Sequence, residues 1–200
     1  MVKQPSAQRS GMFGLTVIDI LTLAVIGIVF GVLSAFWQTI YITAGAVAGP
    51  LGSAIVGGFV CIPAILAPYI IRKPGVALLA EIISVFGQVL AGNPFGVIIL
   101  VYGLAQGLPA ELVFLATRYK RWDWPTLLAA GALSQAGSWV ASVWVFSFFT
   151  FSIPLLIAVL VAQMISGALL AGVVGKLLGD GLLRTGVLDS FAIAGDTAKS

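Results

Sequence analysis

Two acidic side chains interrupt long apolar runs of this sequence, and an ionisable group in such a setting is a candidate for function. Glu81 is followed at helical spacing by Ser84 and Gln88, and Asn93 ends the same run. This spacing puts the polar groups on one face of a helix. The stripe could line a cavity in which the carboxylate offsets a cation or accepts a hydrogen bond from an amino group. The alternative is a carboxylate that only fixes helix packing.

The second acid, Glu111, has a different setting. It lies seven residues before Arg118 and shares a helix face with it. We expect Glu111 to form a structural ion pair at that end of its helix, with Arg72 or Lys73 of a neighbouring helix as candidate partners. Asp19 begins an apolar run, where a carboxylate complements the helix dipole and needs no further role.

Amide and aromatic side chains recur within the other apolar runs. Tyr102 and Gln106 lie one helical turn apart and form a candidate cavity-facing pair. Gln135 shares a face with Trp139, whose indole could be the wall of a binding pocket or an ordinary interfacial anchor. Gln163 is the strongly polar residue of the last apolar run. In the first outer loop, Gln38, Thr39 and Tyr41 could close over a ligand or be ordinary loop residues.

The residues that most catalytic sites require are missing. The sequence has no histidine, which removes the commonest general base, proton carrier and metal ligand. The single cysteine, Cys61, has no partner in the chain for a disulfide or a thiolate metal site. No Gly-x-x-x-x-Gly-Lys-Ser/Thr motif is present, so the chain cannot power transport itself. We therefore expect no enzyme, no resident cofactor and no metal site.

The elements that must carry these residues are membrane-spanning helices. Of the 200 residues, 60% are hydrophobic and 8% are charged, and the mean hydropathy is +1.13. A helix needs about 20 apolar residues to cross a bilayer. Charges, prolines and glycines divide the chain into six apolar stretches, near 17–37, 51–71, 75–91, 97–117, 125–149 and 155–178. We expect an all-α integral membrane protein: one six-helix domain over 17–178, with a cytoplasmic segment 1–16 and a cytoplasmic tail 179–200.

The cationic residues predict the orientation of these spans. Some precede the first stretch, some lie between the second and third or between the fourth and fifth, and the rest end or follow the sixth. They are Lys3, Arg9, Arg72, Lys73, Arg118, Lys120, Arg121, Lys176, Arg184 and Lys199. The positive-inside rule then places both termini in the cytoplasm of a multi-pass plasma-membrane protein. The formal net charge of +3 favours contact with anionic lipid headgroups, and nothing indicates nucleic-acid binding.

Two runs contain small residues at four-residue spacing, which lets helices approach closely in lipid. In the last stretch, Gly167, Ala171 and Gly175 are expected to pack within the bundle. In the first stretch, the ladder comprises Gly27, Gly31 and Ala35. It could pack internally or face another membrane protein.

Several segments resemble the YkoE type of substrate-binding (S) component of ECF transporters. They cover roughly residues 60–190 and comprise Tyr69–Gly75, Ala80–Ile83, Gly92–Pro94, Gln106–Gly107, Glu111, Phe114–Arg118, Ile165–Gly172 and Thr185–Leu188. The first span matches only in general character, and the alanine motif found in many S components is not evident.

The resemblance implies a six-helix S component that takes up thiamine or its hydroxymethylpyrimidine precursor from outside, as cargo rather than cofactor. It also implies a separate transmembrane coupling protein and cytoplasmic ABC-type ATPase subunits, with Gly27, Gly31 and Ala35 as the expected docking face for the coupling protein. The implied ligand-binding residues are Glu81, Gln88, Asn93, Tyr102, Gln106, Gln135, Trp139 and Gln163.

Two other interpretations remain open from the residues themselves. In a membrane scaffold or assembly subunit, the polar stripes would only pack helices. In a small-solute channel, the chain would transport solute without any ATPase. A ligand that stays bound through purification would favour an S component over a scaffold. Transport into liposomes by the chain alone would favour a channel.

Overall fold

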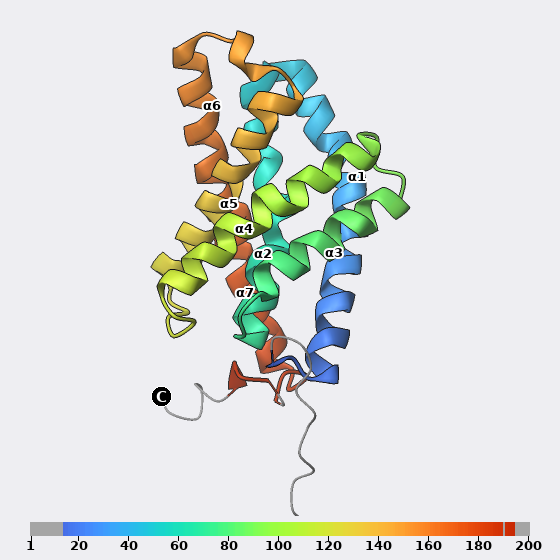
Figure 1. Cartoon of the computed structure of the whole chain (residues 1–200), viewed down its shortest axis with the longest axis vertical. Helices are drawn as coiled ribbons and strands as arrows, with labels where there is room; N and C mark the ends of the chain where they lie inside the picture. The colour runs from blue at the N-terminus through green and yellow to red at the C-terminus, as the bar shows by residue number, and fades with distance from the viewer. Residues whose placement is uncertain (1–13, 190, 195–200) are drawn as a thin grey trace, which may run out of the picture.

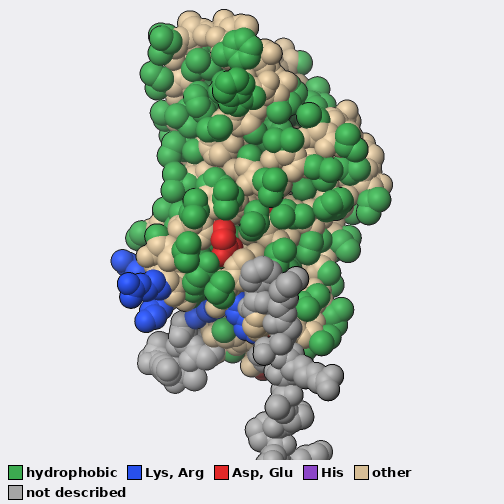
Figure 2. Space-filling model, viewed as in Figure 1, with side chains coloured by type: hydrophobic (Ala, Val, Ile, Leu, Met, Phe, Trp, Pro, Cys, Tyr) green, Lys and Arg blue, Asp and Glu red, His purple; other side chains and the backbone are tan. Residues whose placement is uncertain are grey.

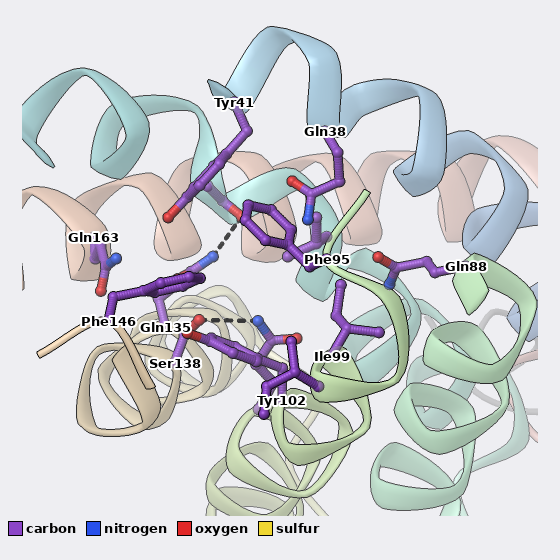
Figure 3. Close-up of a pocket in the computed structure, with 14 residues that line it drawn as sticks. Gln38, Tyr41, Gln88, Phe95, Ile99, Tyr102, Gln135, Ser138, Phe146 and Gln163 are labelled. Atoms are coloured by element: carbon purple, nitrogen blue, oxygen red, sulfur yellow. Dashed lines mark hydrogen bonds between the residues drawn. The ribbon is translucent and has the colours of Figure 1, made fainter. Parts of the chain in front are cut away.

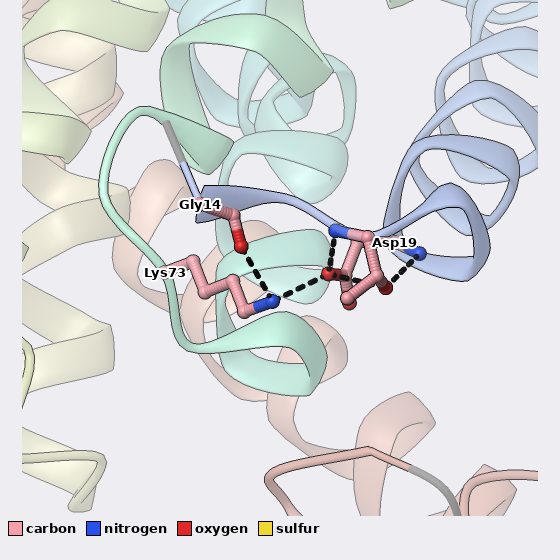
Figure 4. A network of polar contacts seen from close by, with 4 residues as sticks. Gly14, Asp19 and Lys73 are labelled. Atoms are coloured by element: carbon pink, nitrogen blue, oxygen red, sulfur yellow. Dashed lines mark hydrogen bonds and ion pairs between the residues drawn. The ribbon is translucent and has the colours of Figure 1, made fainter. Parts of the chain in front are cut away.

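The first helix begins at a capping box. In the computed structural model, which describes residues 14–189 and 191–194, the Thr16 N–H and hydroxyl both donate to the Asp19 carboxylate, at 2.7 and 2.8 Å. The Lys73 ammonium donates to the same carboxylate at 2.6 Å and to the Gly14 carbonyl at 2.9 Å (Figure 4). Asp19 therefore does more than complement the helix dipole, because it ties the start of the first helix to the loop after the second.

Every regular element in the described part of the chain is helical, so the expected all-α class is confirmed there. The elements are α1 (Val17–Val56), η2 (Gly57–Cys61), α2 (Ile62–Ile71), α3 (Val76–Leu90), η3 (Gly96–Ile99), α4 (Leu100–Ala116), α5 (Trp124–Val145), η4 (Phe148–Thr150), α6 (Ile153–Ser166), η5 (Gly167–Val173) and α7 (Val174–Arg184). Residues 1–13 and 195–200, with the predictions made for Lys3, Arg9 and Lys199, lie outside the described residues.

The first helix is much longer than expected. The sequence predicts a span near 17–37 and a loop before 51, but helical structure continues to Val47, and the chain turns only at Ala48 and Gly49. Gly49 has a φ of +62° and Pro50 follows it, so the turn occurs where the left-handed region favours glycine. The expected first outer loop is therefore wrong: Gln38, Thr39 and Tyr41 lie on α1 itself. Figure 1 shows the chain rising along α1, turning at the top and descending through α2.

Three helical stretches in the described chain are long and apolar enough to cross a membrane: Val17–Ile71, Gly96–Ala116 and Ile153–Arg184. Val76–Leu90 is a shorter apolar helix. The last stretch runs past the expected end at 178 because α6, the π-helical η5 and α7 follow one another without a break. In Figure 1, α3 and α4 run obliquely across the front of the bundle.

Glycines allow the helices to touch through their backbones. A Cβ added at Gly137 of α5 would lie 1.8 Å from the Ala105 carbonyl oxygen of α4. Gly131 of α5 and Gly167 of η5 face each other, and a Cβ on either would come within 2.3 Å of the other's carbonyl oxygen. As expected, the ladder that includes Gly167 packs within the bundle.

The small-residue ladder of α1 also packs internally. Gly27 is buried against Ile83, and Gly31 is buried against the backbone of Ser84 and Gly87. α3 therefore occupies the face that was expected to dock a coupling protein. Only Ala35, which is partly exposed, retains some free surface.

Charged side chains gather at one end of the molecule. Figure 2 shows Lys and Arg side chains at the lower end of this face, below a surface that is mostly hydrophobic. Near this end, the Lys176 ammonium donates to the Tyr69 hydroxyl at 2.9 Å and to the Asp180 carboxylate at 2.8 Å. It also lies 5.1 Å from the centre of the Trp124 ring. This network joins α2 to α7 and to the start of α5.

Candidate functional site

A cavity is lined by residues from the half of the bundle away from the Lys and Arg side chains that Figure 2 shows. Its wall combines amides, aromatic rings and small or aliphatic side chains. The residues that line it are Gln38, Tyr41, Gly57, Val60, Gln88, Phe95, Ile98, Ile99, Tyr102, Gln106, Gln135, Ser138, Phe146 and Gln163. α1, α3, α4, α5 and α6 all contribute to this wall (Figure 3).

Three of the five glutamines in the wall are held by other polar groups. The Asn93 amide nitrogen donates to Gln88 Oε1 at 3.0 Å, which leaves the Gln88 amide hydrogens available. Gln106 Nε2 donates to the Ser138 hydroxyl at 2.9 Å. Gln135 Nε2 donates to the backbone carbonyl of Gly57. These contacts fix the direction in which each amide presents its donors and acceptors.

The remaining two glutamines have unused acceptors. The Oε1 atoms of Gln38 on α1 and Gln163 on α6 are buried and accept no hydrogen bond within the described chain. A buried acceptor without a donor costs free energy. A ligand that donates hydrogen bonds inside the cavity would recover that cost.

Aromatic rings form the outer part of the cavity. Phe95, from the turn after α3, and Phe146, from the end of α5, meet edge to face with ring centres 5.5 Å apart. Tyr41 of α1 contacts Phe95 in the same way at 6.4 Å. Tyr102 lies deeper, and its hydroxyl is 2.9 Å from the Ser142 hydroxyl. These rings supply flat apolar surfaces against which a planar ligand can stack.

An open groove with about 710 Å³ of empty volume adjoins the cavity. It shares Tyr41, Phe95 and Phe146 with the cavity wall and continues along the turn within α1, past Gly49 and Pro50. The three shared rings therefore lie where the cavity meets the open groove. A ligand entering from the groove would have to pass these rings.

The structure brings five of the eight sequence-predicted site residues together on the cavity wall: Gln88, Tyr102, Gln106, Gln135 and Gln163. Asn93 does not line the cavity but orients Gln88 and accepts a hydrogen bond from the Phe95 N–H at 2.9 Å. Trp139 does not line it either, and its buried indole N–H has no partner within the described chain. Trp139 therefore contributes no ring to the cavity wall.

Glu81 also lies outside the cavity wall. Its side chain is fully buried, and neither carboxylate oxygen has a hydrogen-bond partner among the described residues. It packs against Gly107 of α4, two helical turns below Gln88 on the same face of α3. The carboxylate is therefore beneath the cavity rather than in it.

Sequence reasoning missed Phe95, Ile99 and Phe146. Phe95 follows the Asn93–Pro94 turn, and Phe146 closes the apolar run of α5. One aromatic residue directly after a turn and another directly before a turn were the available signal. It could not be read as a site because aromatic residues at the ends of membrane spans are usually interfacial anchors.

Glu111 lies at the charged end and is fully engaged by structural contacts. Its carboxylate accepts hydrogen bonds from the backbone N–H groups of Gly75 and Ala77 at 2.6 and 2.9 Å. The Tyr119 hydroxyl donates to it at 2.6 Å. The expected ion pair with Lys73 is wrong, because Lys73 pairs with Asp19. Glu111 instead caps the N-terminus of α3, where backbone N–H groups lack partners.

Two groups in the loop between α4 and α5 have shifted pKa values. Burial and the hydrogen bond to the Glu111 carboxylate raise the pKa of Tyr119. Hydrogen bonds from Thr126 and from Arg121 lower the pKa of Asp123 to about 2. Asp123 is the N-cap of α5, so the lowered pKa follows from its capping geometry.

Comparisons with known proteins agree on the class of protein that this chain resembles. Residues 18–137 match the family described as "ABC-type cobalt transport system, permease component". The chain is 39% identical over 181 residues to YkoE of Bacillus subtilis (strain 168), a protein named as an HMP/thiamine permease protein. This match covers 90% of the chain and 91% of YkoE. A solved structure described as an S-component of ECF transporter superposes with a TM-score of 0.90 at 39% identity, covering 92% and 94% of the two chains.

Proposed function

This chain belongs to the YkoE type of S components of ECF transporters, and we propose that it captures thiamine or its hydroxymethylpyrimidine precursor from outside the cell. It is a transporter component and not an enzyme. The observation that carries the proposal is a cavity lined by five glutamines and several aromatic rings, with no charged side chain among its lining residues.

The cavity's chemistry suits an aminopyrimidine ring. Such a ring is flat, has nitrogen atoms that accept hydrogen bonds and carries an amino group that donates them. Gln88 offers free amide hydrogens, and Gln38 and Gln163 offer free carbonyl oxygens. The aromatic side chains supply stacking surfaces. Both thiamine and the precursor contain this ring, so the shared part of the two compounds is the part that the wall fits.

The same wall argues against phosphate esters as ligands. Binding of a phosphate usually requires Arg, Lys or a set of backbone N–H groups. None of the lining residues is cationic, and the described Lys and Arg side chains on the face in Figure 2 lie at the opposite end. We therefore infer that the protein accepts the unphosphorylated compounds.

Glu81 is proposed to act on the positive charge of thiamine from beneath the cavity. Two helical turns separate Glu81 from Gln88, a rise of about 10 Å. Across about 10 Å at an effective dielectric constant of about 20, two opposite charges attract by about 1.7 kcal/mol, or more than tenfold in affinity. An unpaired carboxylate away from water is costly, so a bound cation offsets part of that cost.

The proposed orientation is six crossings with both termini in the cytoplasm. The Lys and Arg side chains that Figure 2 shows lie at the end of the bundle opposite the cavity, and the positive-inside rule puts that end in the cytoplasm. The cavity then opens outward. Because the sequence has no ATP-binding loop, a transmembrane coupling protein and cytoplasmic ABC-type ATPase subunits are proposed to supply the energy. The coupling protein is proposed to contact α1 at the partly exposed Ala35, because Gly27 and Gly31 are buried against α3.

Calorimetric titration of the full chain in lipid nanodiscs tests the proposal. We expect one-to-one binding of thiamine and of hydroxymethylpyrimidine, and no binding of thiamine phosphate. Glu81→Gln should weaken thiamine binding about tenfold and leave the neutral precursor nearly unaffected. Absence of heat with both unphosphorylated compounds would contradict the proposed function. Equal thiamine affinities for the wild type and Glu81→Gln would remove only the role of Glu81.

A further inference from the structure

The chain that descends from the outer turn is broken at the level of the cavity. Helix α1 ends at Val56, a 3-10 turn covers Gly57–Cys61, and α2 starts at Ile62. A change from α-helix to 3-10 helix leaves backbone carbonyls without their usual partners. In a membrane each such carbonyl needs a donor from another part of the protein. One donor, the Gln135 amide on Gly57, belongs to the cavity wall.

The second donor comes from α1. The Trp37 indole N–H donates to the Val56 carbonyl at 2.9 Å. The same indole stacks on Phe59, with ring centres 4.2 Å apart and planes inclined by 15°. Trp37 therefore holds the broken segment through both a hydrogen bond and an aromatic contact, although it does not line the cavity.

The third donor comes from the end of α6. The Ser166 hydroxyl donates to the Ile55 carbonyl at 2.6 Å and accepts from the Gly58 N–H at 2.9 Å. Ser166 lies outside the cavity wall, and the π-helical turn Gly167–Val173 follows it directly. Irregular turns of this kind are frequent at functional sites. One buried hydroxyl thus joins the broken segment to an irregular turn in the last helical stretch.

The segment held in this way is itself part of the cavity. Gly57 and Val60 line it, and the backbone has little room to shift. A Cβ added at Gly58 would lie 2.2 Å from the Ser166 carbonyl oxygen. The position of this wall therefore depends on contacts made outside the cavity.

We propose that Trp37 and Ser166 are positioning residues for the ligand, because they hold the backbone of residues 55–58 where Gly57 can accept from Gln135. Without their hydrogen bonds, the segment moves, the Gln135 amide loses its fixed direction, and the ligand meets a less ordered wall. This inference rests on the proposed function for the identity of the ligand.

Two conservative variants of the full chain test it. Trp37→Phe keeps an aromatic ring on Phe59 but removes the indole N–H, and Ser166→Ala removes the hydroxyl. Trp144→Phe and Ser152→Ala are the matched controls, because both residues are exposed and neither lines the cavity. In nanodiscs, thiamine binding is measured by calorimetry, and backbone amide hydrogen exchange is followed by mass spectrometry with and without thiamine.

We expect Trp37→Phe, which removes one hydrogen bond, to weaken thiamine binding about fivefold. Ser166→Ala removes two hydrogen bonds and should weaken thiamine binding at least as much. Amide exchange should accelerate in residues 55–61 and not elsewhere, and saturating thiamine should slow it again. The controls should match the wild type. Affinities within twofold of the wild type would overturn the inference, as would exchange that accelerates across the whole bundle.

The outcome for the proposed function is separate. A wild-type protein that binds neither thiamine nor the precursor contradicts that function. In that case, amide exchange in Trp37→Phe and Ser166→Ala alone tests the inference. Faster exchange confined to residues 55–61 would support a positioning role for Trp37 and Ser166, and faster exchange across the whole bundle would overturn it.

Discussion

The carboxylate of Glu111 on α4 accepts a 2.6 Å hydrogen bond from the backbone N–H of Gly75, just before α3 begins. One acidic side chain thus substitutes for the missing cap of a neighbouring helix, since Gly75 makes no side-chain cap of its own. The negative charge also lies where the helix dipole favours it. The start of the helix that carries Gln88 is therefore fixed from α4.

Replacing Glu111 by alanine should destabilise the protein by about 2 kcal/mol or more, because several buried backbone donors lose their acceptor. Thermal unfolding in detergent measures the effect. Leu112→Ala, at a half-exposed neighbouring position of α4, is the control and should change stability much less. Equal losses for the two variants would show that the cap at α3 carries no special stability.

A methyl group at Gly137 should force α4 and α5 apart, because its Cβ would overlap the Ala105 carbonyl oxygen. We expect Gly137→Ala to lower the stability by at least about 2 kcal/mol. Gly181→Ala is the matched control: no atom lies within 4 Å of its added Cβ. Since alanine favours helix by up to about 1 kcal/mol over glycine, the control should be neutral or stabilised, and a destabilised control would argue against the packing explanation.

Gln163→Leu should have opposite effects on binding and on stability. The buried Oε1 of Gln163 has no donor in the described chain, so leucine removes an unsatisfied group and should leave the ligand-free melting temperature equal or higher. Thiamine binding should weaken by about tenfold if a ligand donor uses that oxygen. Calorimetry and thermal unfolding of one preparation measure both effects, and unchanged affinity would exclude Gln163 from the site.

Asp123 should give stability a measurable pH dependence. Its pKa is lowered to about 2 in the folded protein, compared with about 3.9 in an unfolded chain. The stabilisation is therefore complete above about pH 4 and is lost as the pH falls toward 2. Asp123→Asn keeps a good N-cap but cannot ionise. We expect the melting temperature of the wild type to exceed that of Asp123→Asn near pH 6 and the difference to vanish near pH 2; a constant difference would contradict the shift.

The helices and the polar wall could be predicted from the sequence to a large extent. Lipid-facing apolar runs leave few positions for amides, so Gln88, Gln106 and Gln135 stand out, and the structure places all three on one cavity. Trp139 stood out for the same reason, yet it is not among the residues that line the cavity. A helical spacing fixes which residues share a face of one helix, but it cannot say which neighbouring helix that face meets.

The turn at Ala48 and Gly49 could not be placed from composition. Gln38 and Tyr41 look like loop residues because polar groups interrupt the apolar run there, but α1 continues past them and delivers both to the cavity. Gly27 and Gly31 show the same limit. Small residues indicate close approach, and only the three-dimensional arrangement identifies α3 as the helix that approaches.

The amides of the cavity wall differ in their freedom to turn. Rotating a glutamine amide by half a turn exchanges its donor and its acceptor. Gln88, Gln106 and Gln135 are held by hydrogen bonds, whereas the oxygens of Gln38 and Gln163 are not. The cavity wall thus combines amides of fixed direction with amides that are free to exchange donor and acceptor. Without any backbone movement, the wall can therefore present either a donor or an acceptor at Gln38 and at Gln163.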